Sequence, residues 1–151
     1  MPTDSTRKIK VTKRILIMGL PGSGKTTLAN SLKLELQQAD KIVTWFNADD
    51  VRKQYNDWDF SHEGRIRQAG RMKILTGLSL AEFAICDFVA PLPEQRNLFD
   101  PAWTIWVDTV SEGRFADTNK LFVPPKKYDF RVTEQDSKRW AKIIAGTLLK
   151  I

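Results

Sequence analysis

The chain has 151 residues, of which 42% are hydrophobic and 28% charged, and this size and composition fit one globular domain rather than a disordered or fibrous chain. The sequence contains no apolar run near the ~20 residues that a membrane-spanning helix needs, and the short apolar run behind its basic start is too short for a signal peptide. Cys86 is the only cysteine, which excludes an internal disulfide and suits a reducing compartment. We therefore expect a soluble, cytoplasmic protein.

The net charge of +6 raises the hypothesis of nucleic-acid binding. Residues 1–14 carry five basic residues against Asp4, so this leader accounts for +4 of the net charge. It is either a solvated face or an arm that binds nucleic acid. The remaining basic excess, between residues 52 and 73, fits a pocket for a small anion better than a nucleic-acid face. We therefore predict a basic N-terminal arm over residues 1–13 and one domain over residues 14–151.

Strand and helix patterns alternate along the chain. The apolar run 14–18 ends in a glycine-rich segment, as buried parallel strands do, and leucines at helical spacing predict a helix over 25–38. Further strands are predicted at 42–46, 83–89, 104–107 and 129–132. One helix is predicted to follow Ser61 and extend to about residue 78. A closing helix, capped by Thr133, is predicted to place these residues on one face: Trp140, Ile143, Ile144, Thr147 and Leu148. This alternation predicts an α/β fold, a five-stranded parallel sheet with helices on both faces.

Residues 19–26 match the phosphate-binding pattern GxxxxGK[ST], the P-loop, between the first strand and the first helix. Glycines let the backbone N–H groups curl around phosphate oxygens, and the helix N-terminus that follows favours bound anions. We expect Lys25 to reach the β- and γ-phosphates of ATP and to act in catalysis, and the Thr26 hydroxyl to hold Mg²⁺. The predicted nucleotide site consists of Gly19, Leu20, Pro21, Gly22, Ser23, Gly24, Lys25, Thr26, Thr27 and Arg114.

The P-loop alone does not specify a reaction. GTPases carry an Asn-Lys-x-Asp guanine reader, and here Asn119-Lys120 is followed by Leu121-Phe122, so that class is excluded. A short chain with a P-loop near its start is typical of a small-molecule kinase. The sequence therefore predicts a P-loop kinase fold.

A carboxylate on the loop after the second strand can accept the proton of an attacking hydroxyl or bind magnesium-bound water. Asp49 and Asp50 occupy this place, and Arg52 follows Asp49 by one helical turn, where it can hold an anionic substrate. Either aspartate can instead cap a helix. Because one can cap while the other acts, we assign the catalytic role to Asp49.

Asp87 ends the third apolar strand, as the Walker B aspartate does in other nucleotide kinases. Two interpretations remain open for it. It orders magnesium-bound water together with Thr26, or it is a buried carboxylate paired with a neighbouring hydroxyl or with Lys25.

The P-loop, the segment FNADDVR at 46–52 and Phe60-Ser61 with Arg65 together resemble the adenylylsulfate kinase (APS kinase) family. Members have a DGDNVR-like segment and then a GFS…R…N stretch. The resemblance continues in Phe88-Val89-Ala90-Pro91 and in the segment 105–109. It implies transfer of the ATP γ-phosphate to the 3′-hydroxyl of adenosine 5′-phosphosulfate (APS), which gives PAPS.

The resemblance also assigns the acceptor residues. It implies that Asp49 lies beside the acceptor hydroxyl and that Phe60 packs on the substrate adenine. It places Arg52 and Arg65 at the substrate anion. The full substrate-binding set that it implies is Asp49, Arg52, Phe60, Arg65, Gln68, Ala90 and Pro91. Trp58, in the same polar loop as Phe60, is a further candidate for the wall of the acceptor pocket.

The sequence departs from the family at several of these positions. Asn47 stands for the first Asp of DGD, Gln68 for an Asn, and Ala90 for a Ser. The family's long lid after Arg114 is cut short.

Three interpretations of function therefore stay open. The leading one is an APS-kinase-like phosphotransferase with a small anionic nucleotide as substrate. The second keeps the chemistry with a polynucleotide 5′-hydroxyl or another metabolite hydroxyl as acceptor. The third is a nucleotide-binding module without catalysis. We expect no membrane partner, and a homodimer is an open alternative to a monomer.

Overall fold

The computed structural model describes residues 11–113 and 115–150, which form a five-stranded sheet in the order β2-β3-β1-β4-β5. Every pair of neighbouring strands is parallel. The strands are β1 (Lys13–Met18), β2 (Val43–Asn47), β3 (Phe83–Asp87), β4 (Trp103–Val107) and β5 (Phe130–Val132). The predicted strands are confirmed, although β3 ends two residues before its expected end at residue 89.

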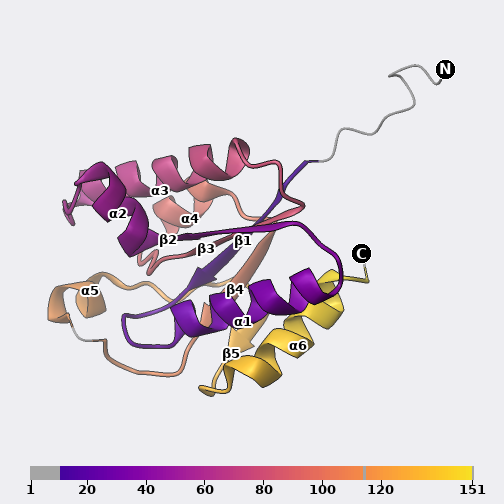
Figure 1. Cartoon of the computed structure of the whole chain (residues 1–151). Helices are drawn as coiled ribbons and strands as arrows, with labels where there is room; N and C mark the ends of the chain where they lie inside the picture. Colours follow the sequence, from indigo (N-terminus) through magenta and orange to yellow (C-terminus); the bar gives the residue numbers. More distant parts are fainter. Residues whose placement is uncertain (1–10, 114, 151) are drawn as a thin grey trace.

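Helices cover both faces of this sheet, as predicted (Figure 1). One face carries α1 (Lys25–Gln38) and α6 (Ser137–Leu148), which pack against each other. The other face carries α2 (Ala48–Tyr55), α3 (His62–Gly77) and α4 (Pro93–Phe99). The short helix α5 (Ala116–Leu121) lies beyond the end of the sheet at which the strands terminate (Figure 1).

Strand β1 supplies the centre of both hydrophobic cores because its side chains alternate between the two faces. Ile15 and Ile17 pack on the α1 and α6 side, and Leu16 and Met18 pack on the α3 and α4 side. All four side chains are fully buried. Burial of each contributes on the order of 1.5–3 kcal/mol, so the strand that leads into the P-loop is firmly fixed.

The sheet order creates a crevice at the carboxyl ends of the central strands. From β1 the chain first builds β2 and β3 on one side and then crosses to β4 on the other. Such a switch point is where open α/β sheets bind their ligands. The P-loop follows β1 directly, and the ends of the next two strands lie side by side, because Asn47 is in register with Asp87.

Several local predictions are wrong. Helix α6 is capped by Asp136, whose carboxylate accepts the Arg139 backbone N–H, and not by Thr133. Its buried residues are Ala141, Ile144, Ala145 and Leu148. Ile143 is 43% exposed, so the predicted buried face is rotated. The sequence patterns also did not predict α2, α4 and α5, which have eight, seven and six residues.

The division into an arm and a domain stays a prediction. Residues 1–10 of the expected arm lie outside the described part of the chain, and β1 begins at Lys13, one residue before the expected domain boundary. Among the described residues, no helix is long and apolar enough to cross a membrane.

Candidate functional site

The P-loop turns sharply between β1 and α1. Gly24 has a φ of 101°, in the left-handed region that glycine adopts without strain, and it is the N-cap residue of α1. No side chain caps this helix, and the first backbone N–H groups of any helix have no acceptor within the helix itself. The Lys25 ammonium donates to the Leu20 carbonyl at 3.1 Å, across the loop. This arrangement is a ready-made site for phosphate.

A cavity of about 860 Å³ opens beside the P-loop. Its lining includes Lys25, Thr26 and Asp87, the part that we call the nucleotide or P-loop end, and Trp58 and Phe60, the part that we call the acceptor end. Its other lining residues come from the P-loop, β2 and α2, α3, the end of β3, α5 and the loop before α6: Pro21, Gly22, Gly24, Thr27, Asn47, Ala48, Asp49, Arg65, Phe88, Val89, Phe115, Asp117, Thr118 and Gln135. The predicted phosphate and acceptor sites therefore share one cavity.

Asp87 is 2% exposed and accepts three hydrogen bonds. The Thr26 hydroxyl donates at 2.8 Å, the Trp45 indole N–H at 2.7 Å and the Asn47 amide at 3.0 Å. Burial raises the pKa of this carboxyl, against the opposing effects of the three donors and of Lys25. The pairing with a neighbouring hydroxyl is confirmed. This hydrogen bond does not exclude magnesium binding, because Thr26 and Asp87 are also the two groups that the sequence predicts to bind the ion and its water.

Asp49 lies in the first turn of α2, with its side chain exposed and lining the cavity. The expected loop after the second strand does not exist, because α2 begins at Ala48, directly after β2. The cap is Asn47, whose side-chain oxygen accepts the Asp50 backbone N–H at 3.1 Å. Neither aspartate caps the helix, so the alternative interpretation of Asp49 as a cap is wrong.

Two buried arginines hold Phe60. The Arg52 guanidinium lies 4.2 Å from the centre of the Phe60 ring and donates to the carbonyls of Asp57 and Asp59 at 3.1 and 3.2 Å. Arg65 donates to the Phe60 carbonyl at 2.9 Å and to the Thr118 hydroxyl at 3.4 Å. Burial lowers the pKa of both arginines. Arg65 lines the cavity, whereas Arg52 is not among the lining residues.

Further arginines of α3 fix the same loop from its outer side. The Asp57 carboxylate accepts Arg67 Nε at 2.8 Å and Arg71 at 2.9 Å, and the Asp59 carboxylate accepts Arg67 at 3.0 Å. These donors hold the pKa of Asp57 well below its usual range. A side chain at Gly64 would collide with the Asp59 carbonyl, so the loop approaches α3 closely. The result is a fixed loop whose exposed Trp58 and Phe60 line the cavity.

Other predicted site residues lie outside the cavity lining. Gly19 and Leu20 lie at the base of the P-loop, and Ser23 lines a second, smaller cavity of about 180 Å³ beside it. Gln68 is buried and donates to the Ala48 carbonyl at 3.1 Å. Ala90 and Pro91 are buried in the loop after β3. Arg114 lies outside the described residues. Binding roles for all of these residues stay predictions.

Eight of the residues that line the cavity were not predicted as site residues. Four of them, Asn47, Ala48, Phe88 and Val89, lie in segments that carried the family resemblance, whereas the other four lie in segments with no motif. Phe115, Asp117 and Thr118 come from α5 and its start, and Gln135 comes from the loop before α6. A six-residue helix is too short to show a hydrophobic period, so the pattern offered no sign that α5 forms or closes one side of the cavity. Gln135 donates to the Gly22 carbonyl at 3.3 Å, a contact across 113 residues that no local motif encodes.

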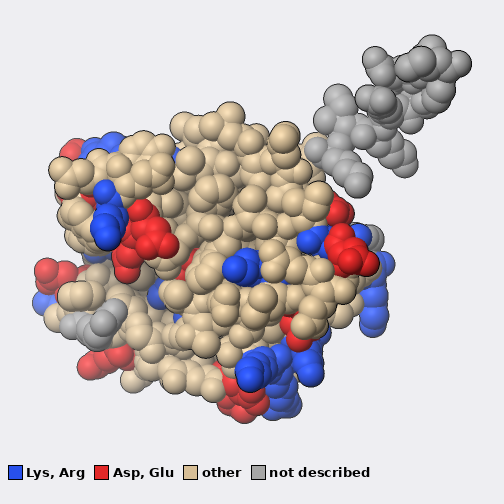
Figure 2. All heavy atoms as spheres, in the orientation of Figure 1, with Lys and Arg blue, Asp and Glu red and all other residues tan. Residues whose placement is uncertain are grey.

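The surface in Figure 2 bears on the nucleic-acid hypothesis. Over the described residues seen in this view, Lys and Arg side chains are interspersed with Asp and Glu and lie mostly toward the edges of the molecule. They do not form one continuous basic face in this view. Nucleic-acid binding needs such a face, and this side of the molecule does not favour it.

The parallel sheet order, the P-loop at its switch point and the adjoining cavity define the P-loop kinase fold. Solved structures agree with this assignment. The structure of the APS kinase of Mycobacterium tuberculosis in complex with AMPPNP and APS has a TM-score of 0.78 and 20% identity, covering 93% of this chain and 99% of that one. A shikimate kinase of Aquifex aeolicus has a TM-score of 0.64 and 18% identity, covering 91% and 96%. At these identities the likeness is one of fold.

Sequence comparisons identify the family. Residues 11–108 match the family model of adenylylsulphate kinase, and this segment is more than half of the chain. The chain is 38% identical over 88 residues to an adenylyl-sulfate kinase of Bacillus licheniformis, and 33% over 87 residues to a probable adenylyl-sulfate kinase of Aeropyrum pernix. Each match covers 56% of this chain, and they cover 44% and 48% of those proteins. The chain therefore belongs to the adenylylsulphate kinase family and spans about half the length of these curated relatives.

Proposed function

We propose that the protein transfers the γ-phosphoryl group of ATP to the 3′-hydroxyl of adenosine 5′-phosphosulfate, giving PAPS and ADP. The observation that carries this proposal is the single cavity, which joins the P-loop to a carboxylate, an arginine and two exposed aromatic rings. Membership of the adenylylsulphate kinase family supports the same substrates. We also keep the homodimer as a prediction, which light scattering tests.

The nucleotide occupies the P-loop end of the cavity in this proposal. The N–H groups at the start of α1 and the Lys25 ammonium bind its phosphates, and Lys25 stabilises the charge that builds up on the γ-phosphate during transfer. Gly24, Thr27 and Gln135 line both this cavity and the smaller one beside the P-loop, so the two adjoin, and the smaller one receives the rest of the nucleotide.

The residues of this chain also fit a magnesium ion. Magnesium binds oxygen ligands, commonly one or two from the protein with the rest from phosphate and water. The Thr26 hydroxyl and the buried Asp87 carboxylate supply such a pair, 2.8 Å apart. Thr26 would bind the ion and Asp87 would hold its water. When bound, the ion neutralises charge on the transferring phosphate.

The acceptor occupies the other end. Asp49 accepts the proton of the acceptor hydroxyl as that oxygen bonds to the γ-phosphorus, and the bond from the phosphorus to the oxygen of ADP breaks. Phe60 and Trp58 offer aromatic faces to an adenine, and Arg65 offers a guanidinium to the phosphosulfate. Arg52 contributes through the position of Phe60.

One observation favours a second candidate, an uncharged hydroxyl acceptor with an aromatic ring. Among the described lining residues the cations are Lys25 and Arg65, whereas Asp49, Asp87 and Asp117 are carboxylates. Asp117 acts on Arg65 electrostatically and so competes with a substrate anion for it. A nucleoside would use the aromatic wall without meeting this competition.

An ADP-release assay with ATP and four acceptor conditions tests the proposal. The conditions are APS, adenosine, a 5′-hydroxyl oligonucleotide and no acceptor, each with mass analysis of the product. We expect release with APS and a product heavier by one phosphoryl group. Release with adenosine alone would favour the second candidate. Release with the oligonucleotide that falls steeply with salt would favour the polynucleotide interpretation. ATP binding without release under any condition would mean a module without catalysis.

A further inference from the structure

Arg96 on α4 contacts two segments that adjoin residues of the cavity lining. It does not line the cavity. Its Nε donates to the Ala90 carbonyl at 2.9 Å, and its terminal nitrogen donates to the Pro91 carbonyl at 3.2 Å and also to the Val123 carbonyl. One guanidinium thus joins two segments that lie more than thirty residues apart in the sequence, the loop after β3 and the segment after α5.

The first segment is strained at the point where Arg96 binds it. Ala90 has a φ of 47°, a left-handed conformation that costs a non-glycine residue about 1–2 kcal/mol. Such strain persists only where the surroundings enforce it, and it is commonly found at functional sites. The two residues before Ala90, Phe88 and Val89, both line the cavity. The Arg96 bond to the Ala90 carbonyl therefore fixes the backbone that carries this wall.

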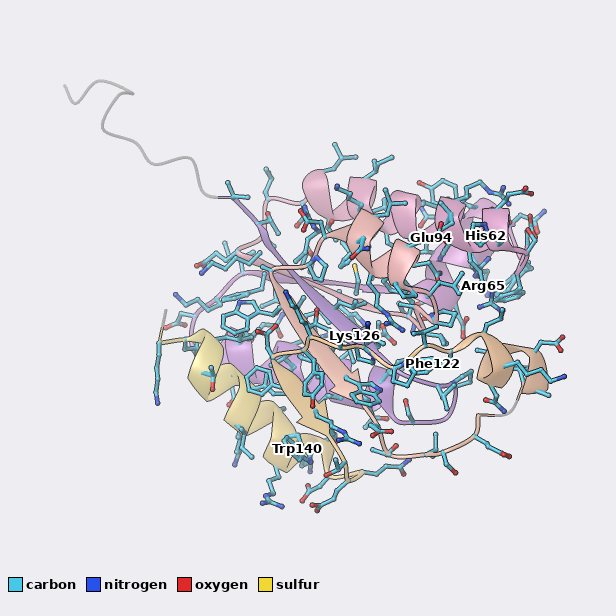
Figure 3. All side chains as sticks on the ribbon, turned by 180° about the vertical axis from the view of Figure 1, so that it is seen from behind. His62, Arg65, Glu94, Phe122, Lys126 and Trp140 are labelled. Carbon is cyan, nitrogen blue, oxygen red and sulfur yellow. The ribbon has the colours of Figure 1, made fainter. Side chains whose placement is uncertain are left out.

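The second segment follows α5, which carries another part of the cavity wall. Val123 also contacts the first segment directly, because its backbone N–H donates a hydrogen bond to the Pro91 carbonyl at 2.8 Å. Phe122, where the chain leaves α5 (Figure 3), has its ring centre 5.6 Å from the Arg96 guanidinium. One turn before it, Asp117 and Thr118 of α5 line the cavity. The position of α5 thus depends on the contacts around Arg96.

The chemistry of Arg96 fits this role. In the described part of the chain no ion pair joins it to a carboxylate, and its three hydrogen bonds go to backbone carbonyls. Burial lowers its pKa to about 10, which leaves it charged at neutral pH. A planar guanidinium offers several donors at fixed angles and can bind three carbonyls at once, whereas a lysine ammonium is a point charge.

We propose that Arg96 is a positioning residue. It fixes the part of the cavity wall formed by Phe88 and Val89 relative to the part formed by α5. This inference rests on the proposed function for its kinetic effect. Loss of Arg96 is expected to raise the KM for the acceptor about tenfold, while the KM for ATP stays within about twofold, because the P-loop is built without Arg96.

The experiment compares Arg96→Met and Arg96→Lys with the matched control Arg14→Met. Arg14 also donates from Nε to a loop carbonyl, that of Asp100, and lies 6.0 Å from the Phe99 ring centre, but it lies at the start of β1, away from the cavity. We expect the acceptor KM to rise most in Arg96→Met, less in Arg96→Lys, and not in Arg14→Met. Added guanidinium should restore part of the loss in Arg96→Met and do nothing for the control.

A second measurement needs no substrate. Hydrogen exchange of the apoprotein should quicken in residues 88–91 and 116–123 of Arg96→Met, with the Val123 amide among the most affected, and stay unchanged there in Arg14→Met. Unchanged exchange in both segments would overturn the inference, and so would faster exchange with an unchanged acceptor KM. If Arg96→Met does not fold, Arg96→Lys carries both measurements. If the parent uses no acceptor, the proposed function fails, and the exchange result still decides whether Arg96 holds the two segments.

Discussion

The two ends of the cavity are built in different ways. The nucleotide end is made mainly from one contiguous segment, residues 19–27, with Asp87 beside it, and depends on a glycine turn and the start of one helix. Apart from Asp49 at the start of α2, the acceptor end is assembled from three segments that are distant in sequence: the loop before α3, the loop after β3, and α5. In each of these segments an arginine side chain donates a hydrogen bond: to a backbone carbonyl in the two loops, and to the Thr118 hydroxyl in α5.

This difference has a consequence for how each end tolerates change. The nucleotide end depends on the backbone geometry of the P-loop itself, so a substitution there directly changes the binding of the nucleotide phosphates. The acceptor end depends on arginine contacts made behind the cavity, as those of Arg67 and Arg71 with Asp57 illustrate. Substitutions outside the cavity are therefore expected to change acceptor use and leave ATP use nearly intact. Four predictions test this contrast.

The largest effect is expected at Lys25. Lys25→Met should lower kcat at least about 10³-fold and leave the fold intact, because its charge acts on the γ-phosphate during transfer. The measurement is ADP release at saturating acceptor, with circular dichroism to check folding. Lys33→Met is the control, since Lys33 lies on the same helix over the Trp45 ring and outside the cavity. Equal turnover in Lys25→Met and the parent would contradict a catalytic P-loop.

Asp49 is expected to have the next largest effect. Asp49→Asn removes the group that accepts the acceptor proton and should lower kcat about 10²-fold, with little change in ATP binding. Asp50→Asn is a closely matched control, because both aspartates lie exposed in the first turn of α2 and both interact with the helix dipole, but Asp50 does not line the cavity. The comparison is of kcat at saturating substrate. Similar losses in the two variants would assign the effect to the helix.

The same contrast explains what could be predicted from the sequence. The P-loop is a contiguous pattern, so its residues, its flanking strand and the exact range of α1 followed from local spacing. Asp49 and Asp87 followed from strand ends, because parallel strands bring their carboxyl ends together. The catalytic and binding roles of these residues stay predictions.

The acceptor end could be predicted only in part. Phe60 and Arg65 were expected at the acceptor pocket from the family pattern, and both line the cavity, as does Trp58. The contacts of Arg52 with the Asp57 and Asp59 carbonyls were not foreseen, nor those of Arg96, because a backbone carbonyl carries no sequence signal. Helices as short as α5 lack a readable period, so its cavity residues were missed too.

Arg65 is expected to contact the acceptor directly, whereas Arg52 is expected to act on it only through the position of Phe60. Matched substitutions of the two arginines test this difference. Arg65→Lys should raise the KM for APS by up to about tenfold, because lysine keeps the positive charge but loses the paired donors of the guanidinium, and so loses only part of the ~1.5–3 kcal/mol that a charge-assisted contact to an anion contributes. Arg52→Lys should raise it less, through the loop. The KM for adenosine distinguishes the two, because Arg52→Lys should affect both acceptors alike, whereas Arg65→Lys should affect chiefly the charged one. A rise in the KM for APS in both variants, with the KM for adenosine unchanged in both, would mean that both arginines bind the anion, as the family pattern implies.

The smallest effect is expected at Asp57, outside the cavity. Its arginine partners hold its folded-state pKa below the usual value, so the stability it contributes is present above the unfolded pKa of about 3.9 and is lost as the pH falls toward the folded value. Asp57→Asn should therefore lower the Tm by about 2–4 °C at pH 7. That difference should shrink as the pH drops below about 4.

The KM for the acceptor should rise a few-fold at pH 7 in the same Asp57→Asn variant, because the Trp58–Phe60 loop loses its contacts with the arginines of α3, while the KM for ATP stays constant. Thermal melts across the pH range, with Asp50→Asn as control, measure the first effect. A Tm difference that is independent of pH would show that the carboxylate charge is not what holds the loop, and an unchanged acceptor KM would show that the loop keeps its position without it.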